Sequence, residues 1–215
     1  MIHVLTDTMT GFITKGGIIM IPILICSILA LGIFVERLIF FAKMRKKGKD
    51  IETTVVSLID QGRDKDAEEA ARQSDSPMGR VLSAAMDVMH LDRETLETVM
   101  IDTTDEEIRE LSAHVQTLAT IANIAPLLGL LGTVFGMIKA FMVIQEMGGK
   151  VNSAVLAGGI WEAMLTTAFG LAVALPVMMA HSYLVAGIDH YEARLQRGSV
   201  KFIKSFSTRN MIRNP

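Results

Sequence analysis

Three long apolar runs are the feature of this 215-residue chain that most restricts its fold. They cover residues 18–42, 118–144 and 158–185. A helix needs about 20 mostly apolar residues to cross a bilayer, so each run is long enough to span one. The composition agrees, since 50% of the residues are hydrophobic. The sequence therefore predicts an all-α membrane protein with three transmembrane helices.

The first run lies where a secretory signal would lie. Its apolar part is longer than that of a signal peptide, and the run ends in GIFVERLIFF in place of a small-residue cleavage site. We therefore expect this run to be retained as a membrane span.

Basic residues at the ends of the runs predict the orientation, because inner flanks carry the excess of Lys and Arg. One group follows the first run and another follows the third: Lys43, Arg45, Lys46, Lys47 and Lys49, then Arg194, Arg197, Lys201, Lys204, Arg209 and Arg213. The opposite side has only Lys15 and Lys150. We expect an outer N-terminal segment (1–17), an inner helical domain (43–117), an outer loop (145–157) and an inner C-terminal helix or tail (186–215).

The inner segment has apolar residues at helical spacing in DIETTVVSLIDQG and PMGRVLSAAMDVMHL, with a short exposed helix and turn expected in RDKDAEEAARQSDS. Ser76 followed by Pro77 favours a helix start, and Asp92 suits the N-cap of a helix that begins near Arg93. No stop signal follows before the membrane. We therefore expect one helix of more than about 40 residues to continue through the second span.

Small residues recur at steps of three and four in the second and third runs. The second carries the heptad stripe Ile108, Leu111, Val115, Leu118, Ala122, Ala125, Gly129, Gly132 and Gly136, and the third carries Ala163, Thr167, Gly170 and Ala174. Such residues let membrane helices approach closely. The two stripes could pack on each other within one chain or against neighbouring chains. Because a polar flank lies beside each stripe, we do not expect the intrachain contact to use up both stripes.

Glu162 is an acid well within a span, where a carboxylate is costly unless it faces water, a partner or an ion pathway. Two other readings are open: it reaches the outer interface, or it pairs with Lys139 at similar depth. Thr133, Thr166 and Thr167 bring hydroxyls towards mid-membrane. A single threonine usually bonds its own backbone, but three on glycine-lined helices favour a hydrated or proton-conducting lining.

Two prolines interrupt the later spans. Pro126 and Pro176 each remove a backbone donor, which predicts helix kinks or a wider inner vestibule. The pair Glu36 and Arg37, at the inner edge of the first span, is expected to be an interfacial anchor. Trp161 and Tyr183 are interpreted as interface anchors, and His114, His181 and His190 as structural residues.

Several classes of function are not expected. Cys26 is the only cysteine, so an intrachain disulfide and a thiol metal cluster are excluded. The net charge of −2 gives no basic excess for a nucleic acid. We find no nucleophile with a positioned base, phosphate-binding loop or zinc-ligand spacing. The sequence thus predicts neither an enzyme nor a metal or cofactor site, and any energy source has to be an ion gradient.

Two stretches carry a family resemblance, IAPLLGLLGTVFGMIKAF and GGIWEAMLTTAFGLAVALP. They closely resemble the signature of the MotA/TolQ/ExbB family of ion-driven motor proteins. The motif match covers roughly residues 118–180. The three-span layout is similar to the ExbB and TolQ branch, whereas the flagellar branch has four spans.

The resemblance implies a homopentamer in the bacterial inner membrane, with a periplasmic N-terminus and a cytoplasmic C-terminus. The pentamer would surround single helices of two copies of an ExbD/TolR-like partner that carries a membrane aspartate. Ion flow past that aspartate, with protons favoured over sodium ions, would drive work, passed to a TonB- or TolA-like protein for transport or envelope maintenance. The alternative is a passive membrane scaffold that organises a complex without conducting ions.

The resemblance also assigns roles to residues. It implies that Thr133 and Thr167 line the ion pathway and that Glu162 is the acid of the third span. Thr166, one helical turn after Glu162, is an alternative to Thr167. Lys139 belongs to no motif of the family and could neutralise Glu162.

Overall fold

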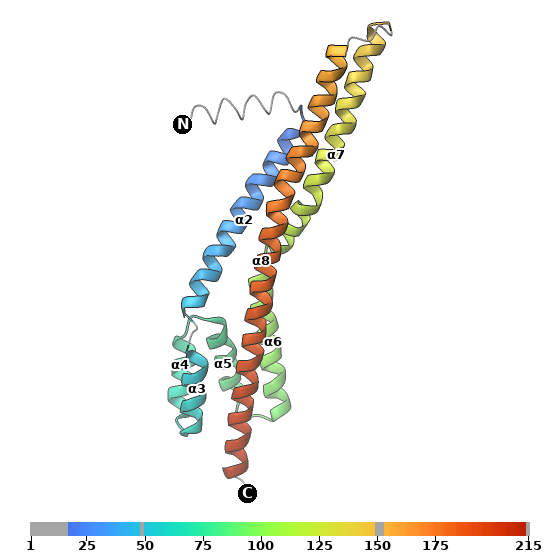
Figure 1. Cartoon of the computed structure of the whole chain (residues 1–215). Helices are drawn as coiled ribbons and strands as arrows, with labels where there is room; N and C mark the ends of the chain where they lie inside the picture. Colours follow the sequence, from blue (N-terminus) through green and yellow to red (C-terminus); the bar gives the residue numbers. More distant parts are fainter. Residues whose placement is uncertain (1–16, 48–49, 149–152, 214–215) are drawn as a thin grey trace, which may run out of the picture. The chain divides into compact units, whose positions relative to one another are not determined.

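The computed structural model describes residues 17–47, 50–148 and 153–213. Every element in these ranges is an α-helix, and no strand occurs in them. The helices are α2 (Met20–Lys47), α3 (Ile51–Asp60), α4 (Asp64–Gln73), α5 (Pro77–Val88), α6 (Arg93–Ser112), α7 (Val115–Glu146) and α8 (Ser153–Arg213) (Figure 1). The first 16 residues, with Lys15, and the basic residues Lys49 and Lys150 lie outside the described ranges.

Three of the helices are long and apolar enough to cross a membrane, over Met20–Met44, Val115–Glu146 and within Leu156–Arg209. This confirms the predicted all-α class with three candidate spans. Large apolar side chains cover the outside of these helices, and Leu127, Phe135 and Met179 are each more than half exposed. In water that surface would be costly, whereas lipid tails accept it.

The chain divides into two compact units. One comprises Met1–Val35 and His114–Tyr183, and therefore holds the start of α2, all of α7 and the first part of α8. The other comprises Glu36–Ala113 and Leu184–Pro215, and holds α3 to α6 with the end of α2 and the rest of α8. Every predicted pathway residue belongs to the first unit.

The second unit has an ordinary hydrophobic core. Val55 and Ile59 of α3, Val81 and Leu82 of α5, and Leu96 of α6 are fully buried. Leu195, Phe202 and Phe206 of α8 belong to the same cluster. The helix predicted in residues 63–76 forms as α4, but Ala67 and Ala71 bury one of its faces, so it is only partly exposed.

The predicted helix starts are confirmed by their capping hydrogen bonds. Ser76 Oγ accepts from the Gly79 N–H at 3.1 Å, with Pro77 at the first helical position. The Asp92 carboxylate accepts from the Thr95 N–H at 3.2 Å at the start of α6. Both signals act within one helical turn, which is why local sequence predicts them.

The prediction of one helix from Arg93 through the second span is wrong. α6 ends at Ser112 and α7 begins at Val115, and between them His114 has φ 62°. That left-handed conformation cannot continue a right-handed helix and is unusual for a residue other than glycine. At the end of α6, the Glu110 carbonyl accepts from the Ala113 N–H at 3.3 Å and from Arg37 Nη1 at 3.2 Å. A side chain from α2 thus caps α6, a contact that no local signal in the sequence indicates. The third span does extend as expected, since α8 is a single helix of 61 residues.

Candidate functional site

α7 and α8 pack against each other through their small residues. Gly129, Gly132 and Gly136 are buried in α7. A Cβ atom on Gly136 would lie 2.9 Å from the Cβ of Ala163, and one on Gly170 would lie 2.6 Å from the Ala125 carbonyl oxygen. Both distances are below van der Waals contact, so the two backbones approach closely only because side chains are absent. Figure 1 shows the two helices running side by side.

This packing shows one use of the stripes. The glycines of α7 face α8 of the same chain, so the intrachain contact is present, and a further contact with neighbouring chains stays a prediction. The physical reason is antiparallel pairing: Gly132 meets Thr166, and Gly136 meets Ala163. The stripe also extends one step further towards the end of α7 and the start of α8, where a Cβ on Gly159 would contact Ala140 at 2.5 Å. The four-residue step from Gly159 to Ala163 could have revealed this from sequence.

The stripe on α8 differs from the predicted one by a single residue. Its buried members are Ala163, Thr166, Gly170 and Ala174. Thr166 is 1% exposed, whereas Thr167, which the prediction placed on the stripe, is only half-buried. Steps of three and four both satisfy helical periodicity, so the pattern alone does not choose between adjacent threonines.

All three threonine hydroxyls donate to backbone carbonyls. Thr166 donates to the Ala163 oxygen at 2.7 Å and to the Gly129 oxygen at 3.3 Å. Thr167 donates to the Gly129 oxygen at 3.0 Å, and Thr133 donates to the Leu130 oxygen at 2.6 Å. A hydroxyl has one proton and two lone pairs, so each side chain keeps only acceptor capacity.

Exposure separates the three threonines further. Thr133 and Thr167 are half-buried, so water or a protonated group can reach their lone pairs. Thr166 is enclosed between α7 and α8, so its lone pairs are not accessible from outside that contact. Thr133 and Thr167 can therefore accept hydrogen bonds from groups outside the α7 and α8 pair, whereas Thr166 is a packing residue.

The ion pair between α7 and α8 that the sequence left open is present. Lys139 Nζ lies 3.3 Å from Glu162 Oε2 and 3.5 Å from Oε1. The Glu162 side chain is 24% exposed and the Lys139 side chain is 70% exposed. A third element reaches the same carboxylate, because a Cβ on Gly17, just before α2, would lie 2.6 Å from Glu162 Oε1. Sequence reasoning missed Gly17.

The other predicted membrane features have simple outcomes. Pro126 and Pro176 both lie inside helices, in α7 and α8, and the kinks expected there stay a prediction. Trp161 and Tyr183 are 63% and 65% exposed, as interface anchors would be. Among the residues that the structure describes, no group of three or more His, Cys, Asp or Glu side chains could hold a metal ion.

The anchor expected from Glu36 and Arg37 is more elaborate than predicted. Their side chains pair at 3.3 Å, but Arg37 is 6% exposed, lies 5.3 Å from the centre of the Phe40 ring and caps α6 through the Glu110 carbonyl. Within the second unit, it therefore fastens the end of α2 to α6.

A buried carboxylate in the second unit was not foreseen. Glu107 is 7% exposed, and both of its oxygens accept from Arg80, at 2.5 Å each. The hydrogen bond to Glu107 raises the pKa of Arg80. Arg80 lies on α5 and Glu107 on α6, so this bidentate pair joins two consecutive helices.

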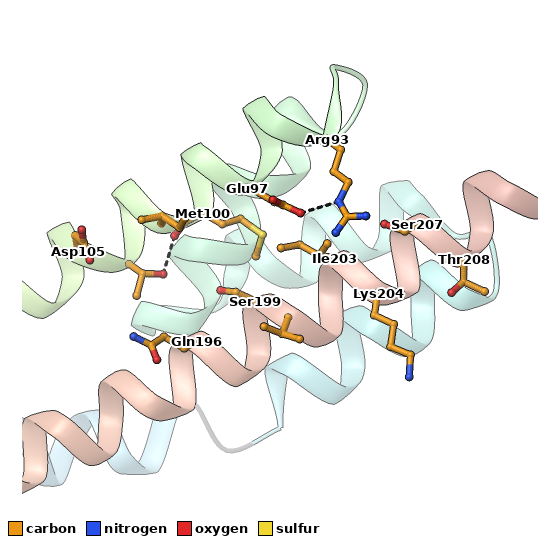
Figure 2. A pocket seen from close by; sticks show the side chains of 13 residues that line it. Arg93, Glu97, Met100, Asp105, Gln196, Ser199, Ile203, Lys204, Ser207 and Thr208 are labelled. Carbon is orange, nitrogen blue, oxygen red and sulfur yellow. Dashed lines mark hydrogen bonds and ion pairs between the residues drawn. The ribbon is translucent and has the colours of Figure 1, made fainter.

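A hollow of about 550 Å³ lies between α6 and α8 in the second unit. Figure 2 shows Met100, Ile203 and Ser199 lining it, and an ion pair of 2.6 Å between Arg93 and Glu97 beside it. The Ser199 hydroxyl is buried and makes no hydrogen bond with the described residues. No predicted pathway residue lines this hollow.

Comparison with known proteins identifies relatives along most of the chain. The sequence model of the MotA/TolQ/ExbB proton channel family matches residues 73–197. The chain is 34% identical over 174 residues to "Putative biopolymer transport protein ExbB-like 1" of Synechocystis sp., an alignment that covers 80% of this chain and 68% of that protein. It is 31% identical over 186 residues to "Putative biopolymer transport protein ExbB homolog" of Methanothermobacter thermautotrophicus, covering 85% of this chain and 64% of that protein.

A shorter alignment reaches the Tol system. The chain is 36% identical over 105 residues to "Tol-Pal system protein TolQ" of Haemophilus influenzae, covering 48% of this chain and 43% of that protein. The matched length is thus less than two thirds of two of these three relatives.

Proposed function

The chain belongs to the MotA/TolQ/ExbB proton channel family, as a multi-pass membrane protein of its ExbB/TolQ branch, and from this premise we propose that it couples proton flow to work on the cell envelope. Such work would be TonB-dependent transport or Tol-type envelope maintenance. The proposed unit is a homopentamer in the bacterial inner membrane that surrounds an ExbD/TolR-like, single-span partner. The partner's membrane aspartate would carry the proton.

One observation carries this proposal. Thr133 and Thr167 are half-buried on adjacent membrane helices, and each commits its proton to a carbonyl, at 2.6 and 3.0 Å. Both therefore present lone pairs to a proton donor. A protonated aspartate or a hydrated proton donates hydrogen bonds, so two such acceptors at a helix surface suit a relay in which the acid is supplied by another chain.

The rest of the proposed pathway follows from charge. Glu162 lies about two helical turns inside the outer end of the α7 and α8 pair, with Lys139 beside it. A carboxylate at that depth would lie at the outer mouth of the pathway, provided that the N-terminus is periplasmic as the basic flanks predict. The proposed order from the outside is then Glu162, Thr133 and Thr167, and the partner's aspartate.

The experiment compares gradient-dependent work in cells that carry single variants. We expect Thr167→Val to abolish it and Thr133→Val to reduce it, because a methyl group replaces the acceptor at constant volume. Thr120→Val is a matched control, since Thr120 is exposed on α7 and its hydroxyl donates to the Gln116 carbonyl at 3.0 Å. The control is expected to work normally.

The same experiment tests the passive scaffold. A scaffold needs the packing of α7 on α8 but no hydroxyl acceptor, so it predicts full activity in all three variants. Full activity in the double variant Thr133→Val/Thr167→Val would therefore refute the pathway. Loss of oligomer on a native gel would instead show that these variants act on assembly.

A further inference from the structure

Glu162 lies where three helices meet. Its carboxylate extends from α8 to Lys139 of α7, at 3.3 Å, and lies against Gly17 at the start of α2. All three elements belong to the first unit. The carboxylate is thus surrounded by one cation and one backbone segment, which is an arrangement that holds a side chain in place.

Gly17 has two independent reasons to be glycine. Its φ is 70°, a conformation that side chains rarely adopt. In addition, any Cβ there would lie 2.6 Å from Glu162 Oε1 and 3.7 Å from Cδ. The turn that leads into α2 therefore lies against the end of the Glu162 side chain, and this turn is closed by hydrogen bonds from the Met20 N–H to the Gly17 oxygen and from the Ile21 N–H to the Ile18 oxygen.

The two members of the ion pair are unequal. The Lys139 side chain is 70% exposed and could reach the interface without its partner, whereas that of Glu162 is 24% exposed and could not. Removing the lysine leaves a poorly solvated charge, and removing the carboxylate leaves a solvated one. The ion pair therefore stabilises the charge of Glu162 more than it stabilises the charge of Lys139.

We propose that Lys139 and Gly17 are positioning residues that hold Glu162 as a fixed, paired carboxylate, which docks the first turn of α2 onto α7 and α8. In this chain Glu162 then acts at the pathway mouth as a stationary charge and does not carry the proton itself. The role of Glu162 at a pathway mouth rests on the proposed function. The docking can be measured separately.

The first test measures thermal unfolding midpoints of the purified full chain in detergent. Gly17→Ala is compared with Gly148→Ala, because Gly148 has a similar φ of 66° but nothing within 4 Å of a Cβ. Both variants suffer the backbone strain, and only Gly17→Ala meets Glu162. We expect the midpoint to fall by about 3 °C or more beyond the control. In a Glu162→Ala background the two substitutions should cost the same.

An equal effect of both glycine variants in the native background would overturn the docking. The proposal would also fail if the excess cost of Gly17→Ala persisted after Glu162 was truncated, because the collision would then have another cause.

The second test is a double-variant cycle read by gradient-dependent work and by unfolding midpoint. Lys139→Met should impair both more than Glu162→Gln does, and Lys139→Met/Glu162→Gln should recover much of the loss because no unpaired charge remains. Lys139→Arg keeps the cation and should behave as the wild type. If Glu162 carries protons instead, Glu162→Gln abolishes work and the double variant stays inactive, which would overturn the proposal.

The two proposals fail in distinguishable ways. If Thr167→Val retains full activity, the pathway is wrong whatever the midpoints show. If the midpoints of the glycine variants are equal, the docking is wrong whatever Thr167→Val does.

Discussion

Adding a single methyl group to Gly132 tests the packing of α7 on α8 most sharply. A Cβ there would collide with the Thr166 side chain, reaching its Oγ1 and lying 2.6 Å from its Cβ and 3.0 Å from its Cγ2. Relief requires Thr166 to move. Its hydroxyl hydrogen bonds to the Ala163 and Gly129 carbonyls, at 2.7 and 3.3 Å, would be strained or lost.

The magnitude follows from these two effects. Overpacking by a methyl group costs about 1–3 kcal/mol, and two weakened hydrogen bonds add about 0.5–1.5 kcal/mol each. The total for Gly132→Ala is about 2–6 kcal/mol. A chain of this size loses about 2–4 °C of unfolding midpoint per kcal/mol, so the midpoint should fall by roughly 4–24 °C. Gly132→Leu adds a larger side chain at the same position and should also disrupt this intrachain contact.

The assay is the thermal unfolding of the purified chain in detergent, followed by circular dichroism. Gly32→Ala is the matched control, because Gly32 lies in the membrane helix α2 with nothing within 4 Å of a Cβ, and alanine there should be neutral or stabilising. Gly132→Ala/Thr166→Ala removes Oγ1 and Cγ2 of Thr166 from the collision but keeps its Cβ at 2.6 Å, so it should recover only part of the midpoint, whereas Gly132→Ala/Thr166→Gly removes all three atoms. If Gly132→Ala is as harmless as Gly32→Ala, the reasoning is refuted.

Two further predictions concern the second unit. Glu107→Gln should destabilise it by about 1–3 kcal/mol in denaturant unfolding, which is less than the ~3–5 kcal/mol of a fully buried pair because the Arg80 side chain is 44% exposed. The control Glu97→Gln breaks an exposed pair with Arg93 and should cost much less. Equal losses of stability in the two variants would contradict this prediction. The Thr95 side-chain and backbone hydrogen bonds hold the pKa of Asp92 below its usual 3.8, so this cap stabilises α6 above that value and is lost as the pH falls through the lowered pKa. Asp92→Asn, which still caps, should therefore lose less stability than the wild type as the pH falls below 3.8, and parallel acid unfolding curves would contradict this.

The features that sequence predicted well are local or periodic. Apolar runs of sufficient length indicated the spans, and Ser76 and Asp92 marked helix starts through bonds to residues three positions later. The stripe of small residues on α7 is buried as its spacing indicated, from Leu118 to Gly136.

The features that sequence missed depend on residues far along the chain. No glycine or proline at His114 indicates the helix break there. The residue that caps α6, Arg37, lies 73 positions away from Glu110 in the sequence. The sequence alone predicts that Glu107 is a surface acid, because only the fold brings Arg80 beside it. Likewise, Thr166 and Thr167 are equivalent by periodicity, and only the antiparallel partner helix separates them.

Proton flux measures the central claim most directly. The chain would be purified with its single-span partner, reconstituted in liposomes, and given a membrane potential while internal pH is recorded. We predict proton uptake by the wild type and by Thr120→Val, and uptake no faster than that of empty liposomes by Thr133→Val/Thr167→Val. Equal uptake by the double variant and the wild type would contradict the assignment of these two hydroxyls to the pathway.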